Sequence, residues 1–229
     1  MLLSIETSTR CAGCALWDEG LVASFQLVAG RRHAEVLLPA IDELCRKAGV
    51  PVGEIDAIAA DVGPGLFTGL RVGLATAKAI SMARGLPSAG VTSLEALAHP
   101  HRRQAGLVAS IVDARRGEVF WSIYRRGGAA HEELQGPSVG APQEAVAEIV
   151  RCWWAAGPGL PLLAVGDGAW RYRELLLDQG ADVAGGSDLW PRPDAVAELA
   201  AGRLGQGEDG AGVAQKGSLE PLYLRAADV

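Results

Sequence analysis

A glycine-rich turn, followed by a helix with small residues at regular spacing, constrains the fold of this chain most strongly. The apolar run at residues 55–60 is short enough to be a buried strand. Residues 63–65, Gly-Pro-Gly, then form a sharp turn, because glycine adopts backbone angles that other residues resist. Gly69, Gly73 and Ala77 recur every fourth residue, which places them on one face of a helix. The stretch therefore predicts a strand, a tight turn and a helix with a nearly bare face that another helix can approach closely.

Two similar series of strands and helices flank a polar, proline-containing segment at residues 99–103. Each series predicts three strands joined by short turns, then alternating helices and parallel strands. We therefore expect a duplicated α/β fold, β-β-β-α-β-α in each half, with an N-terminal lobe at 1–103 and a C-terminal lobe at 104–229. In this scheme the last segment of the C-terminal lobe can pack on the N-terminal lobe. The glycine-rich stretch 205–217 is expected to be a loop. The expected strands cover residues 2–7, 11–17, 21–28, 55–60, 89–92, 107–114, 118–124, 133–139 and 160–165.

The composition is that of an ordinary globular protein rather than a membrane or nucleic-acid-binding one. The 229 residues are 49% hydrophobic and 21% charged, and the net charge is −6. This acidic balance argues against a protein that grips nucleic acid alone, and no apolar run approaches the ~20 residues that a membrane span needs. We also see no signal peptide. Cys11 and Cys14 form a C-x-x-C inside a strand, which favours buried apolar thiols in a reducing cytoplasm over a redox or metal site.

Polar residues at presumed strand ends are the candidate catalytic groups. Glu6 and Thr7 end the first strand, and Asp61 and Asp167 end two others. Carboxylates there can hold a metal or act as a base, but such residues also occur in α/β proteins without that role. The glycine turn can likewise cradle an anion, although its spacing is one residue too long for the dinucleotide fingerprint. We favour the structural interpretation for both features.

The four histidines do not form a recognisable catalytic or metal-binding pattern. His33 begins a helix, where we expect a surface or interface residue, while His99 and His101 flank a proline in the segment between the lobes. None, His131 included, belongs to an H-E-x-x-H pair, and no G-x-S-x-G supports a Ser/His/Asp triad.

Five stretches of the chain carry a recognisable pattern: residues 3–9, 32–39, 63–73, 112–121 and 221–225. Together they resemble the TsaB family, also called YeaZ, whose members help to make threonylcarbamoyladenosine on bacterial tRNA. Glu6 stands where the family usually has Asp, and Leu66 stands where Ser is common. The most specific of the stretches is the one that contains the glycine turn.

The resemblance implies a two-lobed fold of the actin-like ATPase (RNase H-like) class and a catalytic relative, TsaD. TsaD binds its metal through H-x-x-x-H, and the corresponding positions here are Ser93 and Leu97. Leucine cannot ligate a metal and serine replaces imidazole poorly, so we expect no metal, no catalytic residue, no cofactor and no independent activity.

The resemblance further implies a cytoplasmic accessory subunit that docks on TsaD through its first two long helices. The ATPase TsaE would join the assembly, tRNA would be contacted only through the complex, and the chain alone would form a homodimer. Two alternatives stay open: a superfamily enzyme, either a nucleotide-dependent phosphotransferase or a metallopeptidase, and a plain self-associating scaffold. The residues expected at the partner interface are Leu37, Leu38, Ile41, Gly69, Val72, Gly73 and Ala77.

Overall fold

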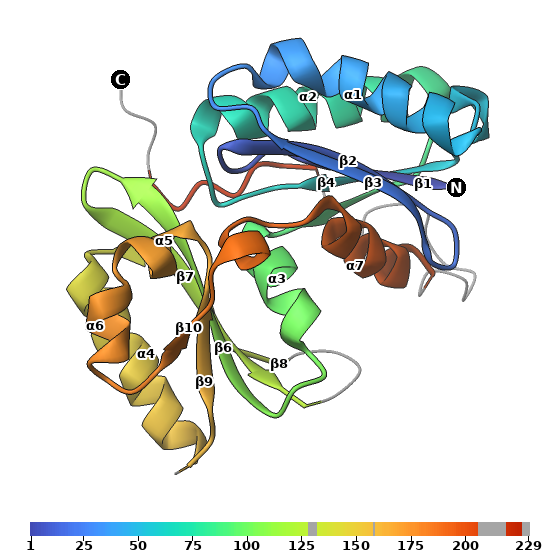
Figure 1. Ribbon diagram of the computed structural model, residues 1–229. Helices are drawn as coiled ribbons and strands as arrows, with labels where there is room; N and C mark the ends of the chain where they lie inside the picture. The colour runs from blue at the N-terminus through green and yellow to red at the C-terminus, as the bar shows by residue number, and fades with distance from the viewer. Residues whose placement is uncertain (128–131, 158, 206–218, 226–229) are drawn as a thin grey trace. The chain divides into compact units, whose positions relative to one another are not determined.

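The computed structural model describes residues 1–127, 132–157, 159–205 and 219–225 (Figure 1). His131 and residues 206–217 of the predicted loop lie outside the described residues. No helix in the described part of the chain is both long and apolar enough to cross a membrane.

Tertiary contacts divide the chain into two units. The first contains Met1–Ser93 and Pro191–Leu222, and the second contains Leu94–Trp190 and Tyr223–Val229. Residues 94–103, which the sequence analysis assigns to the N-terminal lobe, group with the second unit, and the helix after residue 190 returns to the first.

The first unit is built on a mixed five-stranded sheet in the order β3-β2-β1-β4-β5. β1, β2 and β3 form an antiparallel meander, and β4 and β5 continue the sheet parallel to β1. Its strands are β1 (Leu2–Glu6), β2 (Cys11–Trp17), β3 (Leu21–Val28), β4 (Ala57–Asp61) and β5 (Ser88–Val91). Its helices are α1 (His33–Ala48), the short 3-10 helix η1 (Val52–Glu54), α2 (Phe67–Arg84) and α7 (Pro193–Gly205).

The second unit repeats this topology. Its sheet runs β10-β9-β6-β7-β8, so β6 takes the central place of β1, with an antiparallel pair on one side and a parallel pair on the other. The duplication predicted from the sequence is therefore confirmed. The strands are β6 (Gly106–Arg115), β7 (Glu118–Arg126), β8 (Glu132–Gly140), β9 (Leu162–Val165) and β10 (Asp182–Val183). The helices are α3 (Ser93–Ala98, whose first residue belongs to the first unit), η2 (His99–His101), α4 (Pro142–Ala156), α5 (Asp167–Arg171), α6 (Arg173–Leu177) and η3 (Gly186–Leu189).

Helices cover both faces of the first sheet. α1 and α2 pack on one face and α7 packs on the other (Figure 1). The apolar stripe of α1 supplies Leu37, Ile41 and Leu44 to the core beneath it. Both helices end at a left-handed glycine, Gly49 for α1 and Gly85 for α2, as the sequence predicts.

The bare face of α2 packs inside its own unit, against Ile5 of β1 and against Thr7, which directly follows that strand. A Cβ atom added to Gly69 would lie 2.2 Å from the Thr7 carbonyl oxygen, and one added to Gly73 would lie 2.1 Å from Thr7 Oγ1. The expectation that this face is open for a partner helix is therefore wrong, because Thr7 and Ile5 already fill it. Periodicity identifies a small-residue face, but it does not say which element packs there. Of the seven expected interface residues, the five that are buried in the free chain are Leu37, Ile41, Gly69, Gly73 and Ala77.

Candidate functional site

The carboxyl ends of the parallel strands β1, β4 and β5 gather a cluster of buried polar side chains. Ile5 of β1 pairs with Ala60 of β4, so the next residues along the two strands, Glu6 and Asp61, end side by side. Ser93 follows β5 at the same edge. All three polar side chains are at least 98% buried. In open α/β sheets, ligands bind at the carboxyl ends of the strands, so this cluster is the candidate active or ligand-binding site of the first unit.

Asp61 ties the glycine turn to the start of α3. Its Oδ1 accepts hydrogen bonds from the Gly63 backbone N–H and from Ser93 Oγ, each at 2.7 Å. The Ser93 N–H in turn donates to the Gly63 carbonyl at 3.0 Å. Asp61 therefore organises the backbone at this edge of the sheet.

Glu6 is enclosed next to Asp61. Its Oε1 accepts hydrogen bonds from the Ser8 backbone N–H at 2.7 Å and from Ser8 Oγ at 2.6 Å. Burial, followed by the neighbouring negative charge of Asp61, raises the pKa of Glu6 well above its usual value, and the Ser8 hydrogen bonds oppose this. The protonated form is thus favoured, because two adjacent carboxylates do not both ionise easily out of water.

His33, the first residue of α1, is buried rather than exposed, so the expectation of a surface or interface residue is wrong. Its Nε2 lies 2.9 Å from the Thr9 carbonyl oxygen and 3.1 Å from the Cys11 carbonyl oxygen. Both neighbours are acceptors, which assigns the proton to Nε2. The imidazole fixes the β1–β2 connection to α1, and this Nε2 is not available as a base.

These polar groups do not assemble a nucleophile with a base. The Ser93 hydroxyl contacts Asp61 and the Pro64 carbonyl, and the imidazole Nε2 of His33 is bound to two carbonyls. Within the described ranges, no group of three or more His, Cys, Asp and Glu side chains is placed to hold a metal ion.

The two positions that correspond to the metal histidines do not fit a metal. Ser93 is wholly buried with its oxygen engaged as described, and Leu97 is 4% exposed in the apolar core of the second unit. A hydrocarbon side chain offers no lone pair, and a serine hydroxyl is a weaker ligand than imidazole.

The glycine turn packs on the loop that follows β1. The Leu66 N–H donates to the Ser8 carbonyl at 2.6 Å, and a Cβ on Gly65 would lie 2.2 Å from that same oxygen. With the Gly63 N–H bound to Asp61, two amides of the turn already have protein acceptors. The geometry supports the tight-packing interpretation over an anion cradle.

Asp167, the candidate in the second unit, is also a structural residue. Its Oδ1 accepts the Asp113 backbone N–H at 2.9 Å, and burial raises its pKa. Asp113 Oδ2 in turn lies 3.0 Å from guanidinium nitrogens of Arg115 and Arg171.

The cysteines lie apart from this chemistry. Cys11, Cys14 and Cys45 are buried and form no disulfide in the described part of the chain, as the sequence analysis favours for the C-x-x-C pair, and Cys152 is partly exposed. Burial raises the pKa of Cys14 to about 12, which makes it a poor nucleophile.

The outward faces of α1 and α2 expose apolar side chains. Leu38 on α1 is 58% exposed, and Phe67 and Met82 on α2 are 40% and 82% exposed. The Arg71 guanidinium lies 3.7 Å from the centre of the Phe67 ring. Of the seven expected interface residues, Leu38 and the half-buried Val72 are reachable from outside. Phe67 and Met82 were missed, although their place on the helix face opposite the glycines was readable from the spacing. We call Leu38, Phe67, Val72 and Met82 the outer helix face.

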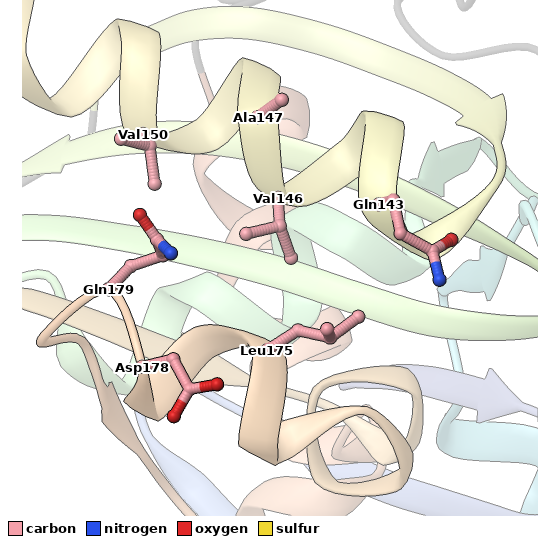
Figure 2. A pocket seen from close by; sticks show the side chains of 7 residues that line it. All are labelled: Gln143, Val146, Ala147, Val150, Leu175, Asp178 and Gln179. Carbon is pink, nitrogen blue, oxygen red and sulfur yellow. The ribbon is translucent and has the colours of Figure 1, made fainter.

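A shallow depression of about 270 Å³ lies between α4 and α6 in the second unit (Figure 2). Its lining combines four aliphatic side chains with two amides and one carboxylate, a set without a paired nucleophile and base. None of the predicted site residues lines it. The lining residues are Gln143, Val146, Ala147, Val150, Leu175, Asp178 and Gln179.

Known proteins match this chain along nearly its whole length. The sequence model of the TsaD family, tRNA N6-adenosine threonylcarbamoyltransferase, matches residues 27–160. A crystal structure of a Pseudomonas aeruginosa protein, described as similar to peptidase YeaZ, superposes with a TM-score of 0.78 at 30% identity, covering 98% of this chain and 99% of that one. The chain belongs to the TsaB (YeaZ) family. The Escherichia coli protein named tRNA threonylcarbamoyladenosine biosynthesis protein TsaB is 29% identical over 231 residues, covering 98% of this chain and 94% of its own.

The comparisons also support the fold class predicted for this TsaB-family chain. A structure of the ethanolamine utilization protein EutJ from Carboxydothermus hydrogenoformans shares the fold alone, with a TM-score of 0.50 at 16% identity. The chain has the duplicated, two-lobed α/β fold of the actin-like ATPase class.

Proposed function

We propose that this protein is a non-catalytic subunit that binds TsaD and supports transfer of the threonylcarbamoyl group to N6 of the adenosine beside the tRNA anticodon. Membership of the TsaB family supports the pathway. The observation that carries the non-catalytic role is the pair Ser93 and Leu97, which replaces the two metal-binding histidines of the catalytic relative. The metal and the transferred group would then be held on TsaD, and this chain needs no cofactor.

The docking surface in this proposal is the outer helix face. Leu38 and Met82 are the most exposed apolar side chains on α1 and α2, and large exposed apolar residues of this kind serve as anchors in interfaces. The buried residues Leu37, Ile41, Gly69, Gly73 and Ala77 act indirectly, since they fix both helices on their own sheet.

The rest of the assembly follows from the same role. TsaE joins TsaD and this chain, tRNA is reached only through the complex, and the chain is cytoplasmic. In the absence of TsaD, the outer helix face can pair with that of a second copy as a homodimer.

The test measures binding of the purified chain to TsaD by isothermal titration calorimetry. Leu38→Glu and Met82→Glu place charges on the outer helix face, and two anchors worth about 2 kcal/mol each predict a loss of affinity of about 1,000-fold. Leu177→Glu is the matched control, because Leu177 is 51% exposed on α6 in the second unit. Unchanged affinity in the double variant would refute the docking face. Tight binding of ATP with Mg²⁺ or Zn²⁺ by the chain alone would favour a superfamily enzyme instead.

A further inference from the structure

Strand β3 forms a long, uncharged and exposed edge of the first sheet. It is the outermost strand on its side, paired only with β2 among the described residues. Its sequence, LVASFQLV, contains no charged residue and no proline. Leu21, Val22, Phe25 and Val28 are between 39% and 54% exposed. An edge with these properties is a template for pairing with another strand.

The other three sheet edges in the described part of the chain are protected. β8, the counterpart of β3 in the second unit, carries Glu132, Glu133 and Pro137, which are devices that prevent edge pairing. β5 has four residues and β10 has two, too short to template a partner strand. Since the two sheets share one topology, the absence of protection on β3 is specific to that edge.

The charges that flank β3 in one copy of the chain are complementary to those of a second copy related by a two-fold axis. The turn before the strand carries Asp18 and Glu19, and the turn after it carries Arg31 and Arg32, all of them exposed. In an antiparallel pairing of two β3 strands centred on Phe25, the acidic turn of each copy approaches the basic turn of the other. By position along the chain, Glu19 falls opposite Arg31 of the second copy.

The same register also matches apolar side chains. It places Val22 opposite Val28 of the second copy and sets the two Phe25 side chains beside each other, which are favourable cross-strand pairs. A depression of about 330 Å³ lies between β3 and α1, lined by Phe25 and Leu44 among others. A neighbouring strand along β3 would run beside this depression and cover its apolar lining.

We propose that β3 is a self-association surface on which a second copy of this chain adds its own β3 antiparallel, joining two sheets into one across a two-fold axis. Such an interface is isologous, because each copy offers the same strand with opposite charges at its two ends. The occupant is this chain itself, since the flanking charges fit their own reversed order. The surface is separate from the outer helix face, so it does not depend on the proposed role with TsaD.

The test uses sedimentation velocity across a concentration series in a Leu38→Glu/Met82→Glu background, in which pairing through the outer helix face is suppressed. This background is expected to dimerise still. Glu19→Arg or Arg31→Glu alone replaces both symmetric attractions by repulsions and is expected to weaken association about tenfold or more. An equimolar mixture of the two variants restores both attractions, so it is expected to form the heterodimer. Phe25→Lys is expected to abolish the dimer, whereas Ser138→Lys on the protected edge β8 is expected to leave it unchanged.

Far-UV circular dichroism is the folding control for each variant. A spectrum identical to that of the wild type would show that the substitution leaves the fold intact. The proposal is overturned if the background variant stays monomeric at ~100 μM, well above the micromolar range of specific association. It is equally overturned if the two charge variants associate as tightly as the background does, or if their mixture fails to associate.

Discussion

The bare face of α2 packs against β1, and this predicts that adding a single methyl group there destabilises the protein. In an open helix interior, Gly→Ala stabilises by about 1 kcal/mol through helix propensity. At Gly69, the new Cβ would lie 2.2 Å from the carbonyl oxygen of Thr7 and 3.3 Å from His33 Nε2. A backbone oxygen cannot move away without shifting β1, and such overpacking costs about 1–3 kcal/mol. We therefore expect Gly69→Ala to lower the free energy of unfolding by up to about 2 kcal/mol, against the sign of helix propensity.

Gly73→Ala tests a clash with a side chain, whereas Gly69→Ala tests a clash with the backbone. Its Cβ would lie 2.1 Å from Thr7 Oγ1, and this hydroxyl donates a hydrogen bond to the Gly69 carbonyl at 2.9 Å. Rotating the hydroxyl away relieves the clash but loses that hydrogen bond, which is worth about 1 kcal/mol. Thr7→Ala removes the oxygen, so in that background Gly73→Ala is expected to be neutral or slightly stabilising. The two substitutions should therefore couple by about 1 kcal/mol or more.

Urea unfolding followed by far-UV circular dichroism measures these differences. Gly202→Ala is the matched control, because Gly202 lies in α7 with open space where its Cβ would go, and it is expected to stabilise by about 1 kcal/mol. If Gly69→Ala and Gly73→Ala both stabilise like the control, the bare face is not packed on β1 and the reasoning fails.

Three further results follow from the polar cluster and the thiols. The raised pKa of Glu6 means that the folded state holds this proton more tightly than the unfolded chain, so its stability contribution is lost as pH rises above about 4.3 through the folded pKa. The melting temperature of Glu6→Gln relative to wild type should therefore increase between pH 4.5 and pH 8, and a constant difference would contradict this. His33→Ala leaves two buried carbonyls without their donor and should destabilise by about 2–3 kcal/mol in urea unfolding, whereas a loss below about 0.5 kcal/mol would refute the assigned hydrogen bonds. Cys152 should react with a thiol reagent well before Cys14 does in the native protein, and the opposite order in mass-spectrometric mapping would show that the burial is wrong.

Elements with a local signal were predictable from the sequence. The strand β2 and the C-terminal ends of α1 and α2 fall where the apolar patterns and Gly49 and Gly85 place them. The duplicated topology followed from the repeated order of strands and helices. Each of these features depends on residues that are close together in the chain.

Features that depend on distant residues were not predictable. The spacing of Gly69 and Gly73 in the sequence shows that α2 has a small-residue face. Its contact with Thr7 is a tertiary contact between residues more than sixty positions apart, so the sequence does not show it. His33 was expected outside, because its hydrogen-bond acceptors are backbone carbonyls at Thr9 and Cys11, which carry no residue-specific signal. The return of α7 to the first unit likewise depends on contacts across more than a hundred residues.

The most direct test of the proposed function is reconstitution of tRNA modification from purified TsaD, TsaE, the threonylcarbamoyl adenylate and tRNA. The expected result is that threonylcarbamoyladenosine forms when the wild-type chain is added, does not form when TsaD is left out, and falls to the level without the chain when Leu38→Glu/Met82→Glu replaces it. Full modification with the double variant, or modification by this chain without TsaD, would contradict an accessory subunit that acts through the outer helix face.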